Sequence, residues 1–197
     1  MFKFTINNFS YYVSLLIACF FIWGFQVKAI SSTNVSSTSL KWDTVKLTWD
    51  DFQMLPPADK SAMSANTTSG IQCKTSLKNH EVVITCGAYF EKLKSWTKLH
   101  DSVLLRHEQL HFDIAELHAR YIKKELKSSI RLKGDYKKIK QILQSNIQAL
   151  EQYQQLYDEE TNHGLNIENQ AIWEQKIAQL LLEYSNHQDD VISVTLN

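Results

Sequence analysis

The chain has no excess of charge of either sign, because 21 Lys and Arg side chains stand against 21 Asp and Glu side chains. No stripe or cluster of basic residues stands out either, so the electrostatic footprint of a nucleic-acid-binding protein is missing. Self-similar segments at a fixed period are also missing, which excludes solenoids and other repeat architectures. These absences leave an ordinary globular domain whose function has to be sought in local motifs.

A long apolar run lies near the N-terminus, from about Phe9 to Phe25, with Lys3 before it and no acidic residue nearby. Val27-Lys28-Ala29 follows with the side chains of a cleavage site, so residues 1–29 are predicted to be a secretory signal peptide. Its removal leaves 168 of the 197 residues, with 19 basic against 21 acidic side chains. A chain of that length can form one domain with a real core.

Two other fates of this segment stay open. The apolar run is nearly long enough to span a bilayer and could be retained as an anchor. The segment ending at Cys19 resembles a lipobox, which would make Cys19 the lipidated first residue, although Phe20–Phe25 stays apolar where lipoproteins usually turn polar. Cleavage is favoured, so that residues 30–40 form a Ser/Thr-rich linker and residues 41–197 a single domain.

Cysteine is scarce, and outside the signal segment only Cys73 and Cys86 remain. Residues 71–77 and 81–86 read as the two strands of a hairpin closed by Asn79-His80. With that two-residue loop, the two cysteines face each other in a non-hydrogen-bonded pair on the apolar face, close enough to bridge. We therefore predict a structural disulfide, as expected of an exported protein, with two buried free thiols as the alternative.

Glycine and proline are absent from Asp101 to about Lys127, where helix-forming residues dominate. Asp101 or Ser102 can cap the start of a helix there. One face of this helix carries an apolar stripe that includes three histidines: Val103, Leu104, His107, His111, Ile114, His118 and Tyr121 or Ile122. His107 and His111 thus lie one turn apart, about 6 Å along the axis, and face the apolar side.

His107-Glu108-Gln109-Leu110-His111 is therefore an H-E-x-x-H motif on a predicted helix. Two imidazoles at this spacing can bind one Zn²⁺, and the carboxylate of Glu108 can accept a proton from a zinc-bound water. The alternative is a surface helix with incidental histidines, or core histidines bonded to backbone carbonyls. The motif favours a zinc hydrolase with Glu108 as its catalytic base.

A catalytic zinc needs a third protein ligand. His118 is excluded because it lies about 10.5 Å beyond His111 along the helix axis. We look instead to residues 157–164, where the next predicted helix closes and the chain turns. His163 is the preferred third ligand and Glu160 the second choice, although His163 could instead cap the helix. The remaining histidines are expected to be ordinary surface residues: His80, His100 and His187.

The first half of the chain is expected to be β-rich and the second half helical. Extended segments are predicted at residues 40–48 and 67–73 and in the hairpin, and residues 88–96 are either a further strand or an irregular passage. Helices are predicted at about 101–133, 135–159 and 167–186. Strands first and helices after indicate an α+β fold, with an N-terminal antiparallel sheet followed by the motif helix and two further long helices. The apolar stripes of those helices are expected to be packing faces, with a partner-binding coiled coil as the alternative.

Three segments together resemble a bacterial family of exported proteins that are described as zinc-dependent proteases and grouped by their motif with the zincin metallopeptidases. The resembling residues are Leu104–Glu116 with Ala119-Arg120, Leu47–Phe52, and Tyr157-Asp158-x-Glu160-Thr161-x-His163-Gly164 followed by Gln170 and Trp173. The resemblance covers most of the mature chain. It implies a zincin-like fold, in which a sheet lies above the motif helix and a later helix supplies the third ligand. It implies no substrate, because the family's own activity is inferred.

The expected function is that of a periplasmic or extracellular zinc-dependent metallopeptidase, with His107, His111 and His163 around one Zn²⁺. Its partner would be a peptide or protein substrate, bound in extended form at a strand edge. It would contact a membrane only if the N-terminal segment is retained or Cys19 is lipidated. The alternative is a non-catalytic zinc-binding envelope protein that acts by binding a partner.

Three further side chains have suggested roles. Tyr153 or Tyr157 could donate to the oxyanion of the reaction. Asp113 could accept a hydrogen bond from an imidazole N–H, although a solvated carboxylate on the helix surface is an equal interpretation.

Overall fold

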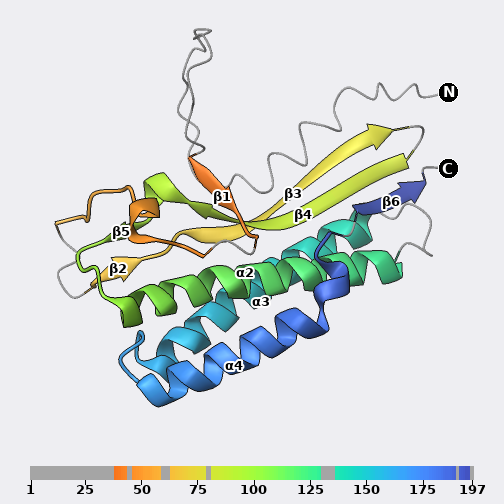
Figure 1. Ribbon diagram of the computed structural model, residues 1–197. Helices are drawn as coiled ribbons and strands as arrows, with labels where there is room; N and C mark the ends of the chain where they lie inside the picture. The colour runs from red at the N-terminus through yellow and green to blue at the C-terminus, as the bar shows by residue number, and fades with distance from the viewer. Residues whose placement is uncertain are drawn as a thin grey trace, which may run out of the picture.

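The computed structural model (Figure 1) describes six stretches of the chain, namely residues 38–43, 46–58, 63–78, 81–129, 136–189 and 191–195. The predicted signal peptide, Cys19 and most of the predicted linker lie outside these residues, as do the hairpin loop and His80. Within the described stretches, no helix is both long enough and apolar enough to cross a membrane.

The described strands form one antiparallel sheet and one short ladder. The sheet consists of β1 (Ser39–Lys41), β3 (Ser69–Lys78), β4 (Glu81–Glu91) and β6 (Val191–Thr195). β4 is its central strand, since β3 pairs along one edge while β1 and β6 share the other. The ladder joins β2 (Ala65–Asn66) to β5 (Trp96–Thr97).

Three long helices make up the other half of the molecule. They are α2 (Ser102–Ser129), α3 (Tyr136–Thr161) and α4 (Ile167–Glu183), with short 3-10 turns at η2 (Trp49–Asp51), η3 (Lys92–Lys94) and η4 (Ser185–His187). α2 lies between the sheet and the other two helices (Figure 1). The architecture is therefore α+β, as the sequence predicts.

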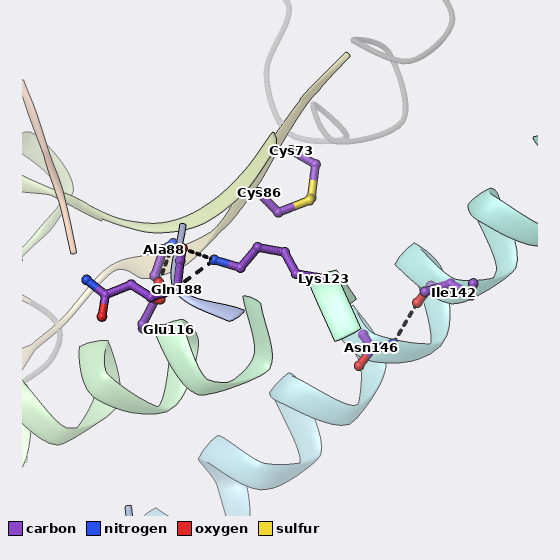
Figure 2. Close-up of a disulfide and its surroundings, with 8 residues drawn as sticks. All are labelled: Cys73, Cys86, Ala88, Glu116, Lys123, Ile142, Asn146 and Gln188. Atoms are coloured by element: carbon purple, nitrogen blue, oxygen red, sulfur yellow. Dashed lines mark hydrogen bonds and ion pairs between the residues drawn. A yellow bond between two sulfur atoms is a disulfide. The ribbon is translucent and has the colours of Figure 1, made fainter. Parts of the chain in front are cut away.

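The β3–β4 hairpin has the register that the sequence predicts. Cys73 lies opposite Cys86, and the two form a disulfide with their Cα atoms 4.1 Å apart (Figure 2). Ile84 is buried on the same face of the hairpin, whereas Thr85 is exposed on the other. The predicted disulfide is thus confirmed, and it is consistent with a protein of an oxidising, extracytoplasmic compartment.

α2 begins where its cap predicts, because Oδ1 of Asp101 accepts hydrogen bonds from the backbone N–H groups of Val103 (2.9 Å) and Leu104 (3.0 Å). The sequence predicts one buried stripe, but most of the helix between His107 and Lys123 is buried. The cause is its central position, since the sheet covers one side of the helix and α3 and α4 cover the other.

Three of the buried charged side chains of α2 lie near the sheet and the segment after α4, and each has a partner. Oε1 of Glu116 accepts from Nε of Arg120 at 3.0 Å, an i,i+4 pair on the helix. Its Oε2 accepts from the backbone N–H of Ala88 in β4 at 3.3 Å. Nζ of Lys123 donates to the backbone carbonyl of Gln188 (Figure 2). These bonds tie the motif helix to the sheet and to the segment after α4, so its position is fixed from both sides.

The predicted strand at residues 40–48 is wrong beyond Lys41. The backbone N–H of Trp42 still donates to the carbonyl of Ala88 in β4 at 2.9 Å, but the side chain of Trp42 and the backbone of Leu47 bond to α2. Nε1 of Trp42 donates to Asp113 at 2.8 Å, and the backbone N–H of Leu47 donates to Oε1 of Gln109 at 2.7 Å. At Leu47 a polar side chain of the helix therefore takes the backbone bond that a neighbouring strand would otherwise make.

The sheet is not wholly N-terminal, because the sequence interpretation missed β6. This strand returns to the sheet after the last helix, where Ile192 lies opposite Ile84 and both side chains are buried. α4 ends at Glu183 and is followed by η4, so the predicted helix to residue 186 is slightly too long.

The core has two parts. One surrounds the motif half of α2 and includes Phe90, Phe112, Leu117, Tyr157, Trp173 and Ile177. The other lies under the disulfide and includes Cys73, Ile84, Ile122, Leu126, Ile142 and Ile192. The residues of the candidate site belong to the first part.

Candidate metal site

His107 and His111 lie one turn apart on α2, and their rings point to a common place. Their Nε2 atoms are 3.3 Å apart. The side chain of His107 is 3% exposed and that of His111 is 13% exposed. The predicted sheltered pair of imidazoles is therefore present.

The third atom at this place belongs to Asp158, in the last turn of α3. Its Oδ1 lies 3.1 Å from Nε2 of His107 and 3.0 Å from Nε2 of His111. These three residues form the group of His, Cys, Asp and Glu side chains that could hold a metal ion in the described part of the chain. Oδ1 of Asp158 is buried, yet none of its contacts has the geometry of a hydrogen bond. A buried acceptor in that state calls for a cation.

The dimensions of this triangle fit zinc. A tetrahedral ion with bonds of about 2.0–2.1 Å separates its ligand atoms by about 3.3 Å. The observed separations are 3.0, 3.1 and 3.3 Å. Two imidazole nitrogens and one carboxylate oxygen are also a donor set used by catalytic zinc sites. The residues present therefore fit one zinc ion with three protein ligands.

The charges at the site favour a cation. Burial acts to raise the pKa of Asp158, but the rings of His107 and His111 hold it well below its usual range. Burial acts to lower the pKa of His111, but Asp158, Glu108 and Gln154 together raise it above its ordinary value. Both shifts follow from a carboxylate oxygen that faces ring nitrogens, and the same oxygen would attract a metal ion.

Each ring is held at its other nitrogen by a glutamine. Nδ1 of His107 lies 3.2 Å from Oε1 of Gln170, and Nδ1 of His111 contacts Oε1 of Gln154. The ring of His107 also stacks on Tyr157, with centroids 4.7 Å apart. Both rings are thus fixed in orientation while the Nε2 atoms stay directed at Asp158.

Glu108 lies between the two histidines in the sequence and is buried. Its carboxylate has no hydrogen bond or ion pair with any residue that the structure describes. Its charge nevertheless reaches the site, because it helps to raise the pKa of His111. A carboxylate without another partner, beside the metal ligands, can accept a proton.

A tight turn after α3 packs against the motif. Asn162, His163 and Gly164 all have positive φ, at 49°, 54° and 81°. The backbone N–H of His163 donates to the carbonyl of Asp158 at 2.9 Å, which closes the helix with a Schellman-type cap. Gly164 then lies against His107, where an added Cβ would be 3.0 Å from that residue's Cβ and Cγ. Only glycine combines this φ with this contact.

The two predicted third ligands lie elsewhere. His163 is beside the site, with Nδ1 3.7 Å from Oδ1 of Asp158, but its side chain is 73% exposed. Glu160 is turned to the α3–α4 corner, where its Oε2 accepts from Nε1 of Trp173 at 2.8 Å. His163 as a ligand stays a prediction, and Asp158 has that position in this structure.

The suggested auxiliary roles are not supported by the geometry. Tyr157 is fully buried, and its hydroxyl donates to Oε1 of Gln170 at 2.8 Å, so the hydroxyl proton is not available to an oxyanion. Asp113 accepts from Trp42 and from Gln109, both at 2.8 Å, and so is not bonded to an imidazole of the motif. Tyr153 makes its ring contacts with His118 and Trp173.

The other histidines take no part in the site. His118, which the sequence excludes as a ligand, is a buried core residue. His100 is exposed and stacks on Trp49, with ring centroids 5.8 Å apart. His187 lies in η4.

Sequence reasoning missed Asp158, Gln154 and Gln170 as site residues. Gln154 and Asp158 are four apart on α3, so both face α2 one turn from each other. This spacing could have indicated a site, because Gln154 and Asp158 are two polar side chains on the face of α3 that packs against α2. No local sequence pattern indicates Gln170, because it lies on α4 and contacts His107 only where α4 packs against α2.

Comparison with known proteins gives one family match, to part of the chain, and no activity. Residues 86–164 match the family described as "Bacterial protein of unknown function (DUF922)". The matched part runs from β4 through α2 and α3 to Gly164, and so contains the motif and Asp158 but not Gln170. Neither the curated proteins nor the solved structures contain a match to the chain.

Proposed function

We propose that this protein is an exported zinc-dependent peptidase. The proposal is carried by one observation: Nε2 of His107, Nε2 of His111 and Oδ1 of Asp158 lie within 3.3 Å of one another. Glu108 adds a buried carboxylate with no other partner among the described residues. The H-E-x-x-H spacing and the resemblance to exported zinc-dependent proteases point the same way.

His107, His111 and Asp158 would hold the zinc ion. When bound, zinc supplies Lewis acidity that lowers the pKa of a coordinated water to about 7 and polarises a carbonyl group. The carboxylate of Asp158 reduces the net charge of the centre by one relative to a site of three histidines. The two rings cannot rotate away, because Gln170 and Gln154 hold their Nδ1 atoms.

Glu108 would move the proton. As a water oxygen bonds to the carbonyl carbon of the peptide, the Glu108 carboxylate accepts the proton that the water releases. When the C–N bond breaks, Glu108 returns that proton to the leaving nitrogen. Burial of Glu108 limits competition from bulk solvent for this proton.

The substrate would lie along the short ladder. The segment between β2 and β3 crosses α2 at the motif, since Oγ1 of Thr67 is 3.5 Å from the backbone carbonyl of Glu108. Oγ of Ser69 is likewise 3.4 Å from that of His111. β2 pairs with β5 on one edge, and its other edge has no strand partner in the described part of the chain. An extended peptide can add to such an edge.

Partial exposure favours a catalytic site over a closed structural one. The side chain of Asp158 is 29% exposed, and His111 also reaches the surface. A structural zinc is enclosed by four protein ligands, whereas a catalytic zinc keeps a position open. The alternative, a zinc-binding envelope protein without activity, is separated from the enzyme by the experiment below.

The test uses the mature chain and its Glu108→Gln variant. Both are loaded with zinc and given a fluorescence-quenched unfolded protein as substrate. Because Glu108 is not a ligand, we expect the variant to keep one zinc per chain and to lose at least about 100-fold in cleavage rate, the scale of general-base catalysis.

Removal of zinc with a chelator should abolish cleavage by the wild type, and added zinc should restore it. Wild-type-like turnover by Glu108→Gln would contradict the assignment of the base. Zinc binding with no cleavage of any unfolded protein would favour the structural alternative.

A further inference from the structure

We propose that Gln170 and Gln154 are positioning residues that hold both motif histidines with their proton on Nδ1, and that Glu174 sets the orientation of Gln170. The inference rests on the zinc site of the proposed function and concerns how that site is prepared for metal. The orientation of each glutamine amide follows from a neighbouring oxygen that can only accept a hydrogen bond.

Gln170 has one possible orientation. Its Nε2 lies 3.0 Å from Oε1 of Glu174, a carboxylate, which only accepts hydrogen bonds. The amide nitrogen must therefore face Glu174, and the amide oxygen faces the opposite way. That oxygen accepts from the hydroxyl of Tyr157 at 2.8 Å and lies 3.2 Å from Nδ1 of His107. Nδ1 of His107 therefore carries a proton, and in the neutral ring Nε2 keeps its lone pair.

Glu174 is itself held in place from α2. Nε of Arg106 lies 3.3 Å from Oε1 of Glu174. Arg106 directly precedes His107 in the sequence, so the chain of contacts starts and ends on α2. It runs from the Arg106 guanidinium through Glu174 and Gln170 to the ring of His107.

Gln154 is oriented by the backbone. Its Nε2 donates to the carbonyl oxygen of His111 at 2.9 Å, and a carbonyl can only accept. Its Oε1 is thereby directed to Nδ1 of the same residue. One glutamine thus bonds both the ring and the backbone of His111, which fixes the rotamer as well as the tautomer.

The consequence is a site made only of acceptors. With both protons on Nδ1, two ring lone pairs and one carboxylate oxygen face one another at 3.0–3.3 Å. Such an arrangement repels itself unless a cation lies among the three atoms, either a proton on one Nε2 or a metal ion, so a metal ion binds there in competition with a proton. The glutamines are neutral and donate less electron density to the rings than carboxylates would, which leaves a bound ion more electrophilic.

The test measures zinc affinity of the full mature chain by competition with a chromophoric chelator. We expect Gln170→Ala and Gln154→Ala each to raise the dissociation constant for zinc by about 10–100-fold, the usual effect of losing a partner of a ligating histidine. The readout needs no substrate, so it is independent of whether the protein cleaves peptides.

Gln109→Ala is the matched control. Gln109 is a buried glutamine of the same helix, but its amide bonds to Leu47 and Asp113 and not to a ring of the motif. Its loss should lower stability while the zinc dissociation constant stays within about 3-fold of the wild type, below the range for a lost ring partner.

A charge-swap variant tests the direction of the bonds. Gln170→Glu combined with Glu174→Gln keeps a hydrogen bond between the two positions but reverses its direction, and it moves the carboxylate next to His107. We expect it to recover zinc binding to the wild-type level or better, because a charged acceptor makes the ring a stronger ligand.

Three outcomes would overturn the positioning role: wild-type zinc affinity in both alanine variants, equal weakening by Gln109→Ala, or a charge swap no better than Gln170→Ala. If the wild type itself binds no zinc, this inference and the proposed function are both contradicted. Zinc binding that depends on the glutamines but is accompanied by no cleavage would contradict only the peptidase.

Discussion

At the scale of single residues, His118 is the buried histidine of α2 that the candidate site does not use. Its Nδ1 has no hydrogen-bond partner among the described residues. Its ring packs against Tyr121 and Tyr153, with centroids 5.3 and 5.4 Å away. Burial lowers the pKa of His118 to about 4, and the backbone of Asn146 opposes that shift only in part. This side chain is therefore neutral in the folded protein at neutral pH.

We expect His118 to weaken the fold in acid. The unfolded chain binds a proton at His118 near pH 6.5, whereas the folded chain does so only near pH 4. The unfolded state therefore holds more protons in this window, and the free energy of unfolding falls as the pH drops from 6.5 to 4. His118→Leu should make that fall shallower, as measured by urea unfolding at several pH values. An unchanged slope in the variant would show that His118 is not a source of acid sensitivity.

His107, Glu108 and His111 could be recognised from the sequence because helix geometry alone brings the two rings together. Asp158 could not be recognised in the same way. It lies 47 residues beyond His111 in numbering, on another helix, and its place depends on how α3 packs on α2. The preference for His163 followed the usual ligand chemistry of zinc, but the turn directs that side chain to solvent.

At the scale of elements, the turn from α3 to α4 bonds to the carbonyl of Asp158 and packs Gly164 against His107. Gly164→Ala should destabilise the protein by more than about 1 kcal/mol, because alanine is strained at positive φ. The added Cβ would also press on the ring of His107. We therefore expect weaker zinc binding together with a lower free energy of unfolding, measured by chelator competition and chemical denaturation.

Asn162→Gly is the control for this turn. Asn162 also has positive φ but is exposed. Glycine adopts a positive φ without strain, so the free energy of unfolding should change by no more than about 0.5 kcal/mol, as for ordinary surface substitutions. Equal damage from both variants would mean that the turn conformation, rather than contact with His107, decides the effect.

The helices and the hairpin could be predicted because each carries its own period, cap or pair of cysteines. β6 could not, because five residues at the end of the chain become a strand only by pairing with β4. The failed strand after Lys41 has a similar cause. Its alternation is real, but Asp113 and Gln109 of α2 compete for Trp42 and Leu47. Tertiary contacts decided both cases.

At the scale of the whole molecule, the candidate site and the disulfide lie in different parts of the core, so a loss of stability at the disulfide need not change the site. The disulfide belongs to the part around Ile122 and Leu126, whereas Tyr157 and Trp173 next to the motif belong to the other. Cys73→Ala with Cys86→Ala opens a loop with a sequence separation of 13 residues. A disulfide that closes a loop of this length raises the free energy of unfolding by about 3 kcal/mol.

We therefore expect the cysteine-free variant to unfold at lower denaturant concentration and yet to bind zinc with wild-type affinity while folded. Chemical denaturation and chelator competition on the same preparation measure both quantities. A large loss of zinc affinity in the folded variant would show that the hairpin and the site are coupled.

The central claim is that His107, His111 and Asp158 hold one zinc ion. Elemental analysis of the purified mature chain tests it most directly, alongside Asp158→Ala, His163→Ala and Glu160→Ala. We expect one zinc per chain in the wild type and in the last two variants. Zinc should be largely lost from Asp158→Ala, since losing a ligand exceeds the roughly 10–100-fold effect of losing an outer partner. Full zinc in Asp158→Ala, with loss from His163→Ala instead, would contradict this account.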